Sequence, residues 1–88
     1  MGSYSVNIHN LSKSDLKKLK HSHLKNNFLD IINTLKIDPY KKSHSFKKLQ
    51  PKQLEMYSRR INYQHRIVYK VNEQTKEVLI LSAWSHYE

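Results

Sequence analysis

Two β-type segments between Tyr57 and Val71 concentrate the side chains of this chain that are best able to hold a phosphate. The first reads Tyr-Ser-Arg-Arg-Ile, the second reads His-Arg-Ile-Val-Tyr, and a short polar turn joins them. Three arginines, Arg59, Arg60 and Arg66, therefore stand among tyrosines and β-branched residues. Because guanidinium groups bind phosphate through paired hydrogen bonds and are costly to bury, we interpret the hairpin as a phosphate-holding surface.

His86 and Tyr87 follow the last apolar segment directly. A histidine gives or takes a proton near neutral pH, and a tyrosine can orient a phosphate or donate a hydrogen bond to it. Arg66, one strand away in an antiparallel pair, is expected beside them to hold a phosphoryl oxygen. We interpret the hairpin and this tail as one RNA-cleaving site, although a surface histidine near a chain end is the simpler alternative on composition alone.

Other chemistries find little support in the sequence. His21 and His23 stand two apart on an expected helix and so point to different sides, and the chain has no cysteine, so we predict no metal site. With one glycine, the chain also lacks a phosphate-cradling loop, and nothing resembles the surroundings of a catalytic serine. We expect no cofactor.

Size and composition favour one soluble domain spanning residues 1–88. The absence of cysteine fits a reducing compartment, and no apolar run has the length of a membrane span or a signal-peptide core. We therefore expect a cytoplasmic protein that does not enter the membrane.

A formal charge of +9, from 16 Lys and Arg against 7 Asp and Glu, predicts a polyanionic partner, and nucleic acid is the commonest. The alternatives are a solubilising surface and a basic face that binds an acidic protein. Lysines on the expected helices either form a solvated surface or contact phosphates without regard to base sequence. Tyr57 either packs inside the sheet or stacks on a base.

Periodicity predicts an α+β fold with the element order β-α-α-β-β-β-β. A strand over 4–8 precedes a short basic helix and a second helix, whose apolar stripe is Leu24, Phe28, Ile31, Ile32 and Leu35. The second helix is expected to end at Asp38-Pro39. Four strands follow, over 46–49, 56–62, 65–72 and 78–84, and pair mainly antiparallel in a twisted sheet. The last of them is the most apolar, so we expect it at the centre.

Three motifs together, Tyr57-Ser-Arg-Arg-Ile61, His65-Arg-Ile-Val-Tyr69 and the terminal His86-Tyr87, resemble the YoeB/Txe family of bacterial type II toxins. These toxins belong to the RelE superfamily of ribosome-dependent mRNA interferases. Each motif alone is weak, whereas the combination is specific. The resemblance covers nearly the whole chain and implies a RelE-like fold, with the two helices packed on the sheet.

The resemblance implies a toxin that enters the ribosomal A site and cuts mRNA by attack of the 2′-hydroxyl on the neighbouring phosphate, without a metal. By position, Arg66 resembles the arginine that steadies the phosphorane, and Arg59 a phosphate-binding arginine. His86 resembles the group that protonates the leaving 5′-oxygen, and Tyr87 the tyrosine beside the scissile phosphate. Further nucleic-acid contacts are expected from Arg60, Lys48, Lys52 and Tyr57.

Lys47 stands where the family places its catalytic glutamate, Gln50 replaces a common lysine, and Glu55 replaces a turn glycine. One hypothesis is that Lys47 is the general base, because neighbouring cations (Lys48, Arg59 and Arg66) would lower its pKa. Alternatively, Lys47 only stabilises charge while the tail histidine moves the protons, or the toxin is weakened or inactive.

Family toxins are made with an antitoxin whose flexible acidic segment covers the site, and the charge of +9 suits such a partner. We therefore expect a YefM-like or related antitoxin, with the ribosome and mRNA as targets and a homodimer as a further possibility. The alternative function is an impaired homologue that acts by occupying the A site or by autoregulation with its antitoxin.

Overall fold

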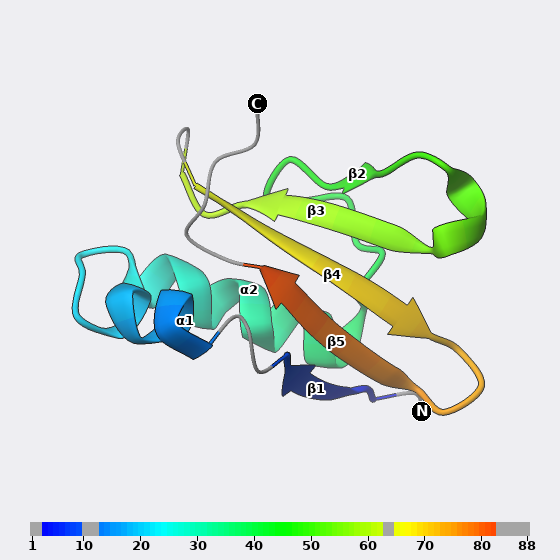
Figure 1. Ribbon diagram of the computed structural model, residues 1–88, viewed down its shortest axis with the longest axis horizontal. Helices are drawn as coiled ribbons and strands as arrows, with labels where there is room; N and C mark the ends of the chain where they lie inside the picture. Colours follow the sequence, from blue (N-terminus) through cyan, green and yellow to red (C-terminus); the bar gives the residue numbers. More distant parts are fainter. Residues whose placement is uncertain (1–2, 10–12, 63–64, 83–88) are drawn as a thin grey trace.

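The computed structural model describes residues 3–9, 13–62 and 65–82, and these form one layer of helices against one sheet (Figure 1). The elements in chain order are β1 (Ser5–Ile8), α1 (Lys13–Lys20), α2 (Lys25–Ile37), β2 (Lys47–Lys48), a 3-10 helix (Lys52–Leu54), β3 (Met56–Arg60), β4 (Arg66–Asn72) and β5 (Glu77–Ser82). The predicted α+β class and element order are confirmed, apart from this added 3-10 turn.

The five strands form one sheet in the order β1-β5-β4-β3-β2. β1 runs parallel to β5, and the other three pairings are antiparallel. The prediction that the last strand is central is wrong, because β4 holds the middle position. The most apolar strand, β5, is nevertheless interior, since the N-terminal strand pairs along its outer edge (Figure 1).

The second helix buries the stripe that its sequence predicts. Leu24, Phe28, Ile31 and Leu35 are buried, and Ile32 is half-buried at the margin of the stripe. The helix ends before Asp38, whose backbone is extended as expected for a residue preceding proline.

The core lies between α2 and the face of the sheet that carries alternate residues of each strand. Its buried sheet residues are Tyr57, Ile61, Ile67, Tyr69, Val71, Val78 and Ile80. Each large aliphatic side chain withdrawn from water contributes roughly 1.5–3 kcal/mol, so this single layer dominates the stability of the fold. Among the described residues, no helix has the length and apolar character needed to cross a membrane.

A carboxylate at the β4–β5 turn ties together three distant segments. Glu73 accepts hydrogen bonds from the Tyr4 hydroxyl (2.8 Å), the Tyr40 hydroxyl and the Lys76 ammonium (2.7 Å). The bonds from Lys76, Tyr40 and Tyr4 lower the pKa of Glu73 to about 2, whereas burial and Glu73 raise the pKa of Tyr40. The turn thus holds β1 and the segment after α2 against the end of the sheet.

Acid should weaken this tie in a defined pH window. Because the folded-state pKa of Glu73 lies below its ordinary value of 4.5, its contribution to stability is complete above pH 4.5 and disappears as the pH falls through about 2. We predict that, between these pH values, the free energy of unfolding falls less steeply with decreasing pH in Glu73→Gln than in the parent. Urea titrations at several pH values check this, with the exposed Glu77→Gln as the control. An unchanged slope in Glu73→Gln would contradict the prediction.

Two isoleucines of α2 offer a matched test of the core. Ile31 is fully buried, whereas Ile37 is 74% exposed. We predict that Ile31→Ala lowers the free energy of unfolding by about 2–5 kcal/mol through lost burial and a cavity. Ile37→Ala should change it by less than about 0.5 kcal/mol. Urea denaturation measures both, and equal effects would show that the stripe has been assigned to the wrong side of the helix.

Candidate functional site

The arginines of the hairpin divide between the two faces of the sheet, because successive residues of a strand point to opposite sides. Arg60 pairs with Arg66 across β3 and β4, and Lys47 pairs with Ser58 across β2 and β3. These side chains share the face away from the helices. Arg59 lies between Ser58 and Arg60 and so faces the helix layer, where it is completely buried.

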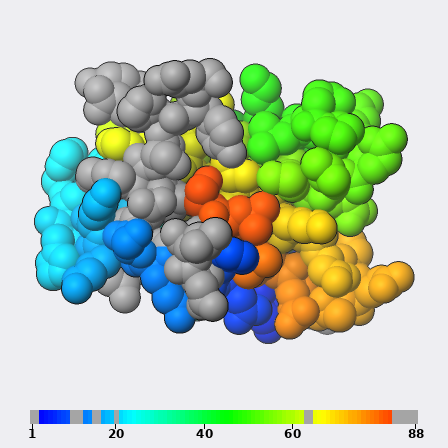
Figure 2. Space-filling model, in the orientation of Figure 1, coloured from blue at the N-terminus to red at the C-terminus, as the bar shows by residue number. Residues whose placement is uncertain are grey.

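Among the described residues, five from β2, β3, β4 and the segment before β2 line a hollow of about 310 Å³ on the face away from the helices: Ser45, Lys47, Ser58, Arg60 and Arg66. Ser58 is buried, and Lys47 and Arg60 are exposed. Figure 2 shows the green segment that carries β2 and β3 at the surface beside the yellow and orange hairpin of β4 and β5.

The part of this lining that the structure describes carries three cations and two hydroxyls and no carboxylate. Two guanidinium groups can each donate a pair of hydrogen bonds to phosphate oxygens, and the lysine adds a point charge. Cations gathered in one hollow repel one another, so a bound anion relieves their repulsion. The arrangement therefore suits a phosphate, and in particular one whose charge increases during a reaction.

The interpretation of Arg59 as a phosphate-binding residue is wrong, because its guanidinium is used inside the protein. Nε donates to the Tyr69 hydroxyl (3.0 Å), Nη1 to the Ser43 carbonyl (2.8 Å) and Nη2 to the Pro39 carbonyl (3.0 Å). The guanidinium also lies over the Phe46 ring, 4.8 Å from its centroid. Arg59 therefore holds the segment that leads into β2, and Arg60 occupies the hollow in its place.

Tyr69 completes the buried polar cluster around Arg59. Its hydroxyl donates to the Pro39 carbonyl at 2.6 Å while it accepts from Arg59. Burial raises the pKa of Tyr69 to about 12, against the opposing effect of Arg59. The phenol therefore remains protonated and keeps its donor role at any pH near neutral.

Tyr57 packs in the core rather than presenting a face to a base, so the stacking hypothesis is wrong. It is only 6% exposed, and its ring contacts those of Phe46 and Tyr69 in stacked arrangements, with centroids 5.5 and 5.8 Å away. Lys48 lies on the same side of the sheet, with Nζ 5.7 Å from the Tyr57 centroid. Lys48 and Lys52 are both exposed and lie outside the hollow, and their RNA contacts stay a prediction.

Two of the three cations that were predicted to crowd Lys47 lie on the other face of the sheet. Lys48 and Arg59 belong to the opposite face, whereas Arg60 and Arg66 line the hollow with Lys47. Ser45 and Ser58 also line the hollow, but they were not predicted as site residues. Ser58 would have been predicted in the lining if its pairing with Lys47 across β2 and β3 had been known.

Three further residues were predicted in or beside the site. His86 and Tyr87 lie outside the described residues. Glu55, which stands where the resemblance implies a turn glycine, has a φ of 54° in the left-handed region that glycine adopts most easily. Within residues 3–9, 13–62 and 65–82, no group of three or more His, Cys, Asp or Glu side chains is placed to hold a metal ion.

The described residues form a small α+β fold with a basic hollow on the face of the sheet away from the helices. A family model described as the YoeB-like toxin of bacterial type II toxin-antitoxin systems matches residues 13–87, so the chain belongs to this family of the RelE superfamily. Comparison with curated proteins gives no match.

Solved structures share the architecture. A YoeB/ParE toxin from Agrobacterium tumefaciens superposes with a TM-score of 0.83 and 21% identity over 94% of this chain and 99% of that one. A YoeB–YefM complex from Staphylococcus aureus gives 0.78 and 22% over 96% and 98%. The archaeal RelE–RelB complex from Pyrococcus horikoshii gives 0.76 and 25% over 92% of each chain.

The adjacent arginines of β3 provide a matched test of the two faces. We predict that Arg59→Met lowers the free energy of unfolding by about 3 kcal/mol, because buried acceptors that lose their donor cost roughly 1–3 kcal/mol each. Arg60→Met, on the exposed face, should change it by less than about 0.5 kcal/mol. Urea denaturation of both variants measures the difference, and a larger effect at Arg60 would refute the assignment of faces.

Proposed function

We propose that this toxin is a metal-independent endoribonuclease that cleaves mRNA in the ribosomal A site and so inhibits translation. The observation that carries the proposal is the hollow that gathers Lys47, Arg60 and Arg66 on the open face of a YoeB-like fold. A single-stranded phosphodiester is the ligand that such a set of donors suits, since its phosphate can approach an open sheet face.

In the proposed reaction the 2′-oxygen attacks the adjacent phosphorus and the bond to the 5′-oxygen breaks. The 2′-hydroxyl loses a proton and the leaving 5′-oxygen gains one, giving a 2′,3′-cyclic phosphate and a 5′-hydroxyl. Arg60 and Arg66 stabilise the negative charge that grows on the non-bridging oxygens. His86 is proposed to protonate the leaving oxygen, and Tyr87 to contact the scissile phosphate.

Lys47 has two proposed roles in this scheme. As a neutral amine it takes the proton of the 2′-hydroxyl; as an ammonium it adds to the charge stabilisation by the two arginines while another group accepts the proton. Its position in the hollow, with both arginines, supports a direct part in either case.

An acidic antitoxin and a second copy of the toxin are the proposed protein partners. The Staphylococcus aureus relative was solved with YefM and also as a dimer. A net charge of +9 on this chain favours a partner whose acidic segment neutralises it.

Mapping of mRNA 5′ ends tests the proposed activity. Incubated with programmed ribosomes, the protein should cut messages at the A-site codon. We predict that Arg66→Ala lowers the cleavage rate by about 10²–10³-fold, the usual effect of removing a donor to a developing oxyanion. Lys70→Ala, an exposed cation on the same strand but outside the hollow, is the control. Equal rates in the parent and in Arg66→Ala would contradict the proposed site.

The cation at position 47 also favours a second function, inhibition by occupying the A site without cutting. Lys47→Glu distinguishes the two. If the parent stops translation without cleavage and only Lys47→Glu cuts the message, occupancy is the function of the parent. If the parent cuts and Lys47→Glu does not cut faster, the endoribonuclease proposal stands.

A further inference from the structure

The segment between α2 and β2 adopts a strained backbone immediately before the hollow. His44 and Ser45 both have a φ of 55°, in the left-handed region that a side chain disfavours. Two such residues in succession persist only where surrounding contacts hold them. The contacts of His44 therefore bear directly on where the chain enters β2.

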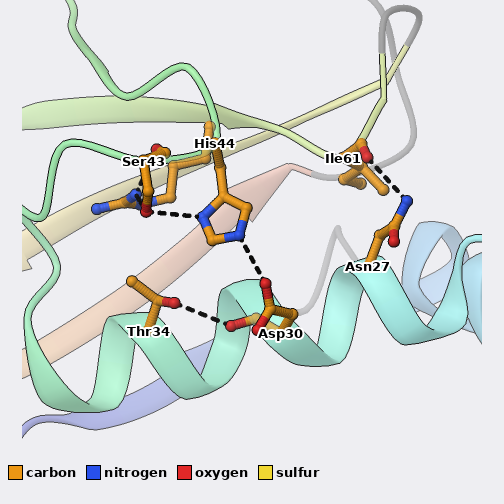
Figure 3. Close-up of polar contacts among 7 residues, drawn as sticks. Asn27, Asp30, Thr34, Ser43, His44 and Ile61 are labelled. Atoms are coloured by element: carbon orange, nitrogen blue, oxygen red, sulfur yellow. Dashed lines mark hydrogen bonds and ion pairs between the residues drawn. The ribbon is translucent and has the colours of Figure 1, made fainter.

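The His44 side chain fastens this segment to the helix layer (Figure 3). Its Nε2 lies 2.7 Å from Oδ2 of Asp30 on α2, and its Nδ1 lies 3.1 Å from the Ser43 hydroxyl oxygen. Figure 3 shows the ring between the two partners, with Asp30 on the helix below it. Charge and hydrogen bonding act together in this pair when the imidazole is protonated, and the hydrogen bond persists when it is neutral.

The His44 backbone is hydrogen-bonded to β3. Its carbonyl accepts a hydrogen bond of 2.7 Å from the backbone N–H of Arg60, whose side chain lines the hollow. The next residue, Ser45, also lines the hollow, and Lys47 follows two residues later. One residue thus joins the helix layer, through its side chain, to the lining of the hollow, through its main chain.

A second fastening acts on the other end of the same segment. Arg59 donates to the Ser43 and Pro39 carbonyls from inside the core. Asp30 makes its contact from the solvent side, since its side chain is 69% exposed. The exposed contact can therefore be removed without opening the core.

We propose that Asp30 and His44 form a latch that positions Ser45 and Lys47 in the hollow, with His44 as a positioning residue for cleavage. Only the last step, the effect of His44 on cleavage, rests on the proposed function of the hollow. Asp30 acts through His44, and His44 acts through the backbone that it holds in the left-handed conformation.

Two substitutions separate the side-chain contact from the backbone conformation. Asp30→Ala removes the partner and leaves His44 with its unfavourable φ. His44→Asn keeps a residue that tolerates the left-handed region but is too short to preserve the contact. Asn33→Ala, at an exposed position of the same helix, is the matched control.

The first readout is amide hydrogen exchange, which requires no activity. We expect the Arg60 amide, which donates to the His44 carbonyl, to exchange about tenfold faster in Asp30→Ala and in His44→Asn than in Asn33→Ala. Amides in the middle of β4 should be unaffected. Because both substitutions break one contact, the double variant should exchange no faster than either single variant. Unchanged exchange at Arg60, or additive effects, would overturn the latch.

The second readout is the coupling of the latch to Lys47 in mRNA cleavage on ribosomes. We expect Asp30→Ala to lower kcat several-fold with little change in KM, and Lys47→Ala to have a smaller effect in the Asp30→Ala background than in the parent. Full additivity with Lys47→Ala would refute the positioning role. If the parent cleaves no message, the proposed function fails, while the exchange result still decides whether Asp30 holds the segment.

Discussion

The buried guanidinium of Arg59 is the interaction on which the rest of the structure depends. A charge withdrawn from water is tolerated only when its donors are matched, and here the acceptors are the carbonyls of Pro39 and Ser43 and the hydroxyl of Tyr69. Those acceptors belong to the connection after α2 and to β4. One side chain of β3 therefore fixes the path from the helix layer into β2, and with it the edge of the sheet where the hollow forms.

Strand alternation gives adjacent arginines opposite roles. Arg59 faces the helices and organises the core, whereas Arg60 faces outward and meets Arg66 across the strand pair. The same alternation sends Lys47 to the hollow and Lys48 to the side of Tyr57. The sheet thus separates a basic cluster of the sequence into one set on the side of the helices, Arg59 and Lys48, and another that lines the hollow.

Much of the fold could be predicted because it depends on local periodicity. The α2 stripe, the end of α2 at Asp38 and the four C-terminal strands all follow from patterns within short windows. The burial of Arg59 could not be read from its chemistry, which favours the surface. One signal was present: Ile67, Tyr69 and Val71 stand two residues apart and so share one face of the strand, and pairing places Arg59 opposite Ile67 on their side. The position of β5, one strand from the centre, could not be predicted without knowing that β1 pairs beside it. That pairing is a long-range contact, which periodicity does not encode.

Lys47 changes the electrostatics of the proposed reaction in a direction that can be derived. A diester carries one negative charge, and the phosphorane formed on attack by a deprotonated 2′-oxygen carries two. Three cations in the described lining attract both species but attract the second more strongly, and only this difference accelerates the chemical step. Where the family resemblance implies a carboxylate, a lysine would add to charge stabilisation in the proposed reaction and would remove a proton acceptor. Proton removal from the 2′-hydroxyl is then the step of the proposed reaction that most needs a catalytic group. The segment before β2 matters for this step because it places Lys47 in the hollow.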